Sequence, residues 1–530
     1  MMSLLLLLAS CSLIDEKITE PELPNQSEEA GDLYLTLTLS LPQTDAATRG
    51  NSSTETDGSS SNDTLGGEEN ENVLNSASLY LYELDGNNKY NVVEKLTEDT
   101  GTKASDVTYR FTYKMAIETI KKYAGKKLGM VIVGNEGEDS GLMHDLTGYT
   151  ATNDKNVFEA GFPITSVKSK PLLGDFGEGN DGQIMPLVNK SGAEIDFSRI
   201  KSNASNKEIL EALSQSYSHT NNTFSITPEI ELERAVARID YADGSNDDFT
   251  YTITSTKKDE SDEGVKVKLY KMELFNVNPS SYLFRHTAVG SSKEAGSKVD
   301  LFGIENGNEN YTPNTYTWIV TSKSETLLNG FDISALSIDN EKGEPLSFLI
   351  LSEDFGSRYY YPDPARNRDY YPWCYVSENA LSSIEDMKEG KLEGKATGVL
   401  FTFQVLGKDG NTLTYSQEKT NYPDGITNSS TPGVKSGTIT ITDQNKYWLN
   451  VEPSEDGYLL KYPAFIKHND PIPGPNYIDP MEYAVVRNNV YQLCVTGVTK
   501  LYNPKEPLGF YLDVDIKVLS WVKHDVGVQW

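Results

Sequence analysis

Near the start of the chain, every second residue over a nine-residue stretch is a leucine. Leu33, Leu35, Leu37, Leu39 and Leu41 are separated by Tyr34, Thr36, Thr38 and Ser40. Because successive side chains of a β-strand point to opposite sides, this period places all five leucines on one face of a strand. A face of that kind must be buried against other elements. The pattern therefore predicts a strand that packs into a β-sheet core and ends at Pro42.

The residues after this strand have the opposite character. The stretch 43–72 is rich in Ser, Thr, Asn, Asp, Glu and Gly and contains no aromatic residue, which is typical of a segment outside a core. Arg49 is the only basic residue between Lys17 and Lys89. We therefore predict that an Arg-specific protease cuts between Arg49 and Gly50. This cut would separate the leucine strand from the rest of the chain.

A short apolar segment precedes these features. The leucines of residues 4–8 are followed by Ala9, Ser10 and Cys11. This arrangement predicts a lipoprotein signal peptide over residues 1–10, with Cys11 as the lipid-bearing first residue of the precursor. A buried strand or helix fragment is the alternative, but the polar residues that follow offer it no packing partner. Residues 11–49 would then be a propeptide removed by cleavage.

Composition limits the class of protein. The chain has 530 residues, with 31 Tyr, 41 Gly and 23 Pro. These residue types favour strands and turns, so we expect a mainly β fold of two or three domains. The formal net charge of −31 argues against a nucleic-acid partner, because phosphate binding needs a basic face. The lipid is the only membrane attachment that we expect.

Alternating or apolar runs predict further strands along the chain. A helix is expected after Ser205, because Ser205 and Glu208 have the spacing of a capping box. We place the junction between two domains near residues 225–235. The expected strands cover residues 79–84, 128–133, 265–270, 399–405, 438–442, 489–498 and 510–518.

No catalytic or metal-binding motif is present in the sequence. The five histidines are scattered and have no neighbour at ligand spacing, so we predict no enzyme activity, metal or cofactor. Cys374 and Cys494 either pair or lie as small buried hydrophobic residues, and the apolar strand pattern around Cys494 favours burial. Two aromatic groups, residues 359–362 and 370–373, flank Arg366 and Arg368. They either contact glycans or proteins, or cover the core.

Three segments resemble the fimbrillin family, the subunits of type V pili. They are Leu232–Asp240 (LERAVARID), Cys374–Asn379 (CYVSEN) and Tyr483–Leu493 (YAVVRNNVYQL). The resemblance is greatest to the shaft subunits of minor-type fimbriae. It implies two transthyretin-like β-sandwich domains with a few short helices, over residues 50–230 and 231–530. It also implies a lipidated outer-membrane precursor, an Arg-specific surface protease, strand exchange, and anchor and tip subunits as partners.

The end of the sequence offers an alternating apolar segment that could serve as a donor strand. Its apolar residues are Val522, Val526, Val528 and Trp530. We expect this segment to enter a neighbouring copy of the chain once the leucine strand has left. The expected product is a cell-surface fimbrium that supports adhesion. The alternative functions are a surface lipoprotein that does not polymerise and a tip adhesin with an aromatic binding loop.

Overall fold

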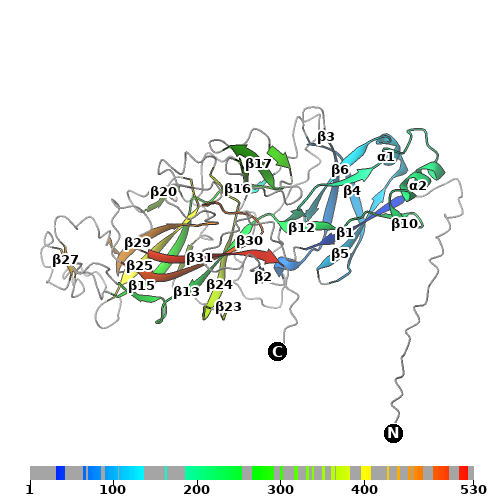
Figure 1. The fold of residues 1–530 in the computed structure, drawn as a ribbon. Helices are drawn as coiled ribbons and strands as arrows, with labels where there is room; N and C mark the ends of the chain where they lie inside the picture. Colours follow the sequence, from blue (N-terminus) through cyan, green and yellow to red (C-terminus); the bar gives the residue numbers. More distant parts are fainter. Residues whose placement is uncertain are drawn as a thin grey trace, which may run out of the picture.

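The computed structural model confirms a mainly β protein with two elongated lobes (Figure 1). One large apolar cluster lies within the first lobe, and the other fills the second lobe and extends onto β3, β4, β6 and β8 of the first. The first lobe contains β1 and the second contains β31. The structure describes residues 32–41, 64–66, 70–84, 90–105, 107–136, 161–163, 186–253, 266–291, 299–301, 315–319, 330–332, 337–339, 349–351, 360–364, 366–381, 395–406, 426–428, 439–441, 452–454, 457–468, 482–499 and 512–522.

One 10-stranded sheet forms the first lobe. Nine of its strands follow the order β10-β11-β1-β12-β8-β6-β3-β4-β5, and β9 pairs with β6. β5 also pairs with β1, so part of the sheet closes into a ring. The alternating apolar side chains of these strands fill the inside of the ring. The strands are β1 (Leu33–Ser40), β3 (Ala77–Leu84), β4 (Tyr90–Lys103), β5 (Thr108–Met115), β6 (Lys127–Gly134), β8 (Leu187–Asn189), β9 (Ala193–Asp196), β10 (Ser218–Thr220), β11 (Thr223–Ser225) and β12 (Ile230–Arg234).

Two short helices accompany this sheet, α1 (Ile117–Lys122) and α2 (Asn206–Ser214). The predicted capping box of α2 is confirmed. The Glu208 amide donates to the Ser205 hydroxyl, and the Ser205 amide donates to the Glu208 carboxylate at 2.7 Å. The apolar face of α2 packs into the core of the first lobe.

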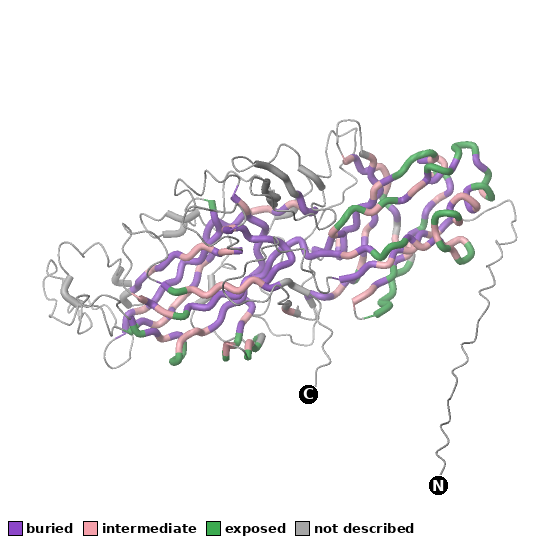
Figure 2. Tube along the Cα trace, in the orientation of Figure 1, coloured by how far each residue is buried: buried purple, intermediate pink, exposed green. Residues whose placement is uncertain are grey.

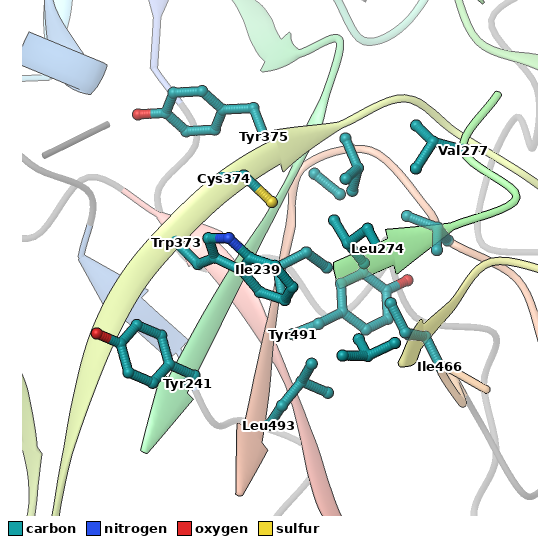
Figure 3. Close-up of a cluster of buried hydrophobic side chains, with 14 of the residues drawn as sticks. Ile239, Tyr241, Leu274, Val277, Trp373, Cys374, Tyr375, Ile466, Tyr491 and Leu493 are labelled. Atoms are coloured by element: carbon teal, nitrogen blue, oxygen red, sulfur yellow. The ribbon is translucent and has the colours of Figure 1, made fainter. Parts of the chain in front are cut away.

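The second lobe is a sandwich of two 6-stranded sheets. Ile239 and Tyr491 come from one sheet and Leu274 from the other, and they lie together in one buried cluster (Figure 3). The first sheet has the order β2 (Thr64–Gly66), β31 (Leu512–Val522), β30 (Asn489–Val498), β13 (Ala237–Asp243), β24 (Arg368–Val376) and β23 (Tyr361–Asp363). The second has β14 (Thr250–Thr252), β15 (Lys266–Phe275), β25 (Gly398–Val405), β29 (Gly457–Phe465) and β28 (Glu452–Ser454), with β22 (Leu349–Leu351) on β15.

Short strands form four smaller sheets. They are β7 (Gly161–Pro163) with β16 (Ser280–Tyr282), β17 (His286–Ser291) with β18 (Val299–Leu301) and β19 (Thr315–Ile319), β20 (Gly330–Asp332) with β21 (Ser337–Asp339), and β26 (Ile426–Asn428) with β27 (Ile439–Ile441). A single-turn 3-10 helix, η2 (Asn70–Asn72), follows β2 in the chain. All the strands that the sequence patterns predict are present, with ends shifted by a few residues.

Between β12 and β13 the chain passes from the first lobe to the second through a short, buried connection. β12 belongs to the first sheet and β13 to the sandwich, and only Ala235 and Val236 separate them. Both residues are fully buried, and the buried colour continues from one lobe into the other (Figure 2). The domain limits 50–230 and 231–530 remain a prediction.

Among the residues that the structure describes, no helix has the length and apolar character that a membrane crossing needs.

Candidate functional site

The leucine strand β1 lies inside the sheet and is paired on both edges. It runs antiparallel to β5 along its whole length, from Leu33 opposite Met115 to Ser40 opposite Thr108. On its other edge it runs parallel to β11 and then to β12. β1 therefore bridges strands that would otherwise leave two open edges.

The five leucines are all buried, with exposed fractions of 0–1%. They belong to one apolar cluster with Phe111, Met115, Leu213 and Phe224, from β5, α2 and β11. The opposite face of β1 is only partly buried, and there the Thr36 and Thr112 hydroxyls are hydrogen-bonded at 3.1 Å. The predicted strand and its buried face are thus confirmed, whereas its pairing partners are a finding of the structure.

Burial of these leucines stabilises the first lobe strongly. At about 1.5–3 kcal/mol for each fully buried side chain, five leucines contribute on the order of 10 kcal/mol. Loss of β1 would leave an apolar groove bordered by the unpaired backbone groups of β5, β11 and β12. A groove of this kind is a binding site for another extended strand.

The predicted processing residues are not part of this described site. The structure does not describe Cys11, Arg49 and Gly50. Their roles in lipidation and cleavage therefore remain predictions. In sequence, Cys11 precedes β1, whereas Arg49 and Gly50 follow it.

The predicted donor segment begins where β31 ends. β31 pairs antiparallel with β30, from Val498 opposite Leu512 to Asn489 opposite Ser520. Val522 is its last residue, opposite Gly66 of β2. Val526, Val528 and Trp530 lie outside the described residues. The donor role of this segment remains a prediction.

The aromatic segment forms a hairpin of β23 and β24 on the sandwich. Arg366 and Arg368 both donate to one carboxylate oxygen of Asp515 on β31, at 2.9 and 3.0 Å. Tyr370 is 0% and Trp373 is 3% exposed, whereas Tyr360 is 52% exposed. The arginines therefore bind a neighbouring strand of the same sheet, and most of the described aromatic side chains are buried. Both findings favour the interpretation that this segment covers the core.

Cys374 and Cys494 are free and buried. They lie on β24 and β30, which flank β13 on opposite sides, so a strand separates them. Neighbouring strands are about 4.8 Å apart, and two such spacings exceed the reach of a disulfide. Burial raises the pKa of Cys494 to about 12, so its thiol stays protonated. Both residues act as small apolar side chains.

The three fimbrillin-like segments meet where the two lobes join. One cluster contains Arg234 and Arg238 from the first segment, with Glu71 from η2. Arg238 donates to Glu71 at 2.7 Å and to Asp240 at 2.8 Å, and the Tyr375 hydroxyl also donates to Glu71. Arg234 donates to the Asn488 side chain, to the Glu71 carbonyl and to the Asn72 side chain.

A second cluster lies beside the first. Arg487 donates to Glu378 at 2.7 Å and lies 3.7 Å from Glu233, which also binds Arg285. Burial raises the pKa of Glu233, and the two guanidinium groups oppose that shift. Burial and the charge of Arg487 lower the pKa of the adjacent His286 to about 3, so its imidazole is neutral near pH 7.

We call these two clusters together the buried joint. It consists of four arginines, Arg234, Arg238, Arg285 and Arg487, and four carboxylates, Glu71, Glu233, Asp240 and Glu378. None is more than 6% exposed. Equal numbers of positive and negative groups make the burial of so many charges tolerable. No local sequence pattern reveals this joint, because its partners are up to 304 residues apart in the chain.

Within the described ranges, no group of three or more His, Cys, Asp and Glu side chains is arranged to hold a metal ion.

Residues 457–526 match the family model described as "Major fimbrial subunit protein type IV, Fimbrillin, C-terminal". These residues are similar to the C-terminal part of fimbrillins. The segment contains β29, β30 and β31, together with one of the three sequence motifs that resemble fimbrillins. The match confirms the resemblance over this part of the chain. No curated protein matches the chain at a significant level.

Several solved structures are similar over most of the chain. A fimbrilin (fimA) from Porphyromonas gingivalis W83 has 15% identity and a TM-score of 0.36, covering 92% of this chain and 98% of that one. The tip fimbrial protein Mfa3 from P. gingivalis has 11% identity and a TM-score of 0.35, covering 93% and 100%. A putative cell adhesion protein from Parabacteroides distasonis has 11% identity and a TM-score of 0.38, covering 92% and 97%. These values are too low to equate the chain with any of them.

Proposed function

We propose that this protein is a structural fimbrial subunit, a pilin, that polymerises by strand exchange. The observation that carries the proposal is the position of β1, a strand that is paired on both edges and carries a row of buried leucines. The fimbrillin match of residues 457–526 supports the same function. A structural subunit needs no catalytic centre, in accordance with the absence of catalytic motifs from the sequence.

In the precursor, β1 acts as a place-holder for an incoming strand. Its covalent tether keeps it near the groove at an effective concentration of roughly millimolar, which a free strand does not match. Cleavage after Arg49 removes that advantage. β1 then dissociates, and the strand of another subunit takes its place. The precursor is anchored by lipid at Cys11, and the cleaved subunit joins a cell-surface fimbrium with anchor and tip subunits.

The geometry of the groove gives the incoming strand a direction. A strand that replaces β1 in the same register runs antiparallel to β5 and parallel to β11 and β12. The proposed donor follows β31 of the second lobe, whereas the groove lies in the first lobe. Donor and acceptor are therefore different surfaces, and such head-to-tail contacts extend into a filament.

The first prediction concerns the cleavage site. The variant Arg49→Ala is expected to fold and reach the surface but to form no fibres, because the tethered β1 still fills the groove. Electron microscopy of cells and mass spectrometry of the surface protein measure the outcome. Arg199→Ala changes an exposed arginine elsewhere and should leave fibres unchanged. Normal fibres from Arg49→Ala would contradict the proposal.

The first residue of the surface protein separates the alternatives. A processed pilin begins at Gly50. A surface lipoprotein that does not polymerise keeps the lipidated Cys11 and the whole leucine strand.

A second prediction concerns the carboxyl end. Removing residues 523–530 leaves β31 whole, so the processed monomer should melt near the full-length temperature. It should accept a donor strand but offer none, and it should therefore cap growing fibres. Removing residues 512–530 is the control, because loss of β31 exposes the side of β30 and should lower the melting temperature strongly. If the variant without residues 523–530 forms normal ladders on mild denaturing gels, the donor strand is another segment of the chain.

A further inference from the structure

β2 belongs to the second lobe, although it lies between two strands of the first lobe in sequence. It pairs in parallel with the last residues of β31, with Thr64 opposite Ser520, Leu65 opposite Trp521 and Gly66 opposite Val522 (Figure 1). The Leu65 side chain also packs against the apolar cluster of the sandwich. Backbone pairing and apolar packing thus both attach this segment to β31.

η2 follows β2 and places a carboxylate in the buried joint. Glu71 is 0% exposed and accepts hydrogen bonds from Arg238 on β13 and from the Tyr375 hydroxyl on β24. Asn72 accepts from Arg234 through its side chain and, through its carbonyl, from the Tyr109 hydroxyl of β5. η2 therefore contacts both lobes, including a strand that borders the groove of β1.

We propose that β2 and η2 form an intramolecular clasp that fixes the two lobes to each other and holds the end of β31 in its own sheet. Two independent observations carry this inference. The first is the pairing of β2 with β31, and the second is the burial of Glu71 beside the arginines of β12 and β13. A single continuous stretch of chain makes both contacts. These contacts add to the connection between β12 and β13, which also joins the two lobes.

The position of the clasp in the sequence has a consequence for processing. The clasp follows Arg49, so cleavage there leaves it on the mature subunit, whereas cleavage beyond Gly66 would remove β2. Val522, where β31 ends, is also the point at which the proposed donor segment begins. The clasp therefore restrains the base of that segment. This last step rests on the proposed function, whereas the clasp itself does not.

The test uses the uncut full chain and hydrogen–deuterium exchange, which requires no fibre. In Leu65→Asp, a charge replaces the apolar side chain that packs on the sandwich. We expect amides at the end of β31 to exchange about tenfold faster or more than in the wild type. Val93→Asp is the matched control, since Val93 is a partly buried apolar residue on β4 in the first lobe. It should leave exchange at 512–522 unchanged.

A second variant tests the other contact. Glu71→Gln keeps the shape of the side chain but removes its charge, and we expect faster exchange in β13 and around Tyr375. Glu83→Gln, which alters a partly exposed ion pair with Lys126, is its control. Unchanged exchange of β31 in Leu65→Asp, or of β13 in Glu71→Gln, would overturn the clasp.

Polymerisation distinguishes the clasp from the proposed function. Processed Leu65→Asp subunits should form ladders sooner than wild-type subunits, because the base of the donor segment is freed. Equal or slower laddering would overturn the restraint on that segment. If neither protein forms ladders while the exchange results are as expected, the clasp stands and the strand-exchange function fails.

Discussion

Arg487→Ala is expected to lower the free energy of unfolding of the second lobe by about 3–5 kcal/mol. Arg487 is fully buried, and its removal leaves the carboxylate of Glu378 without its guanidinium partner and that of Glu233 with Arg285 alone. It also removes donors to the backbone carbonyls of Leu283 and Tyr282. An uncompensated charge away from water costs more than the ion pair itself contributes, so the effect should be large.

An exposed ion pair of the same length is the control for this prediction. Lys126 and Glu83 lie 2.7 Å apart, as do Arg487 and Glu378, but their side chains are 51% and 32% exposed. Lys126→Ala should cost less than about 1 kcal/mol. Urea unfolding measures the free energy of unfolding of both variants. Limited proteolysis identifies the lobe that unfolds. If both variants lose the same free energy of unfolding, burial does not determine how much the ion pairs of the joint contribute to stability.

The second large effect is expected from Leu37→Ala, and it should depend on processing. Leu37 is 0% exposed in the centre of β1, so truncation to alanine should cost the full-length precursor about 2–5 kcal/mol. If β1 leaves after cleavage, the mature subunit no longer contains this residue. Its stability in the fibre should then equal that of the wild type. The same substitution should also speed the release of cleaved β1, since it weakens only the departing strand.

Leu81→Ala supplies the comparison. Leu81 is also 0% exposed and belongs to the same apolar cluster, but it lies on β3, which follows the cleavage site. It should destabilise precursor and fibre alike. Thermal melting of both forms of both variants is the measurement. A Leu37→Ala fibre that is destabilised as much as its precursor would mean that β1 remains in the mature subunit.

The strands with regular patterns could be predicted from sequence because their cause is local. The alternation of Leu33–Leu41 fixed both the strand and its buried face, and the spacing of Ser205 and Glu208 was sufficient for the capped helix. The pairing partners of β1 could not be obtained this way. Its neighbour β11 is a short strand far along the chain, and the choice of partner depends on the closure of the ring.

The buried joint was missed for a related reason. Arg234 and Arg238 alternate with apolar residues, a pattern that normally indicates a strand with one solvated face. Both are instead 0% exposed, because η2, which is distant in sequence, supplies the Glu71 carboxylate to Arg238 and the Asn72 side chain to Arg234. Charge patterns in a sequence show where charges are but not which opposite charge they meet. The role proposed for Arg49, which lies outside the described residues, rests on the sequence pattern.

The connection between the lobes has a mechanical consequence. Only Ala235 and Val236 separate β12 from β13, so the two lobes have no slack chain between them at this crossing. A tensile load along the molecule would pass directly from one sheet to the other. It would pull on the buried ion pairs beside the connection before any linker could extend. The subunit should therefore behave under tension as a stiff rod, with yielding confined to the contacts between subunits.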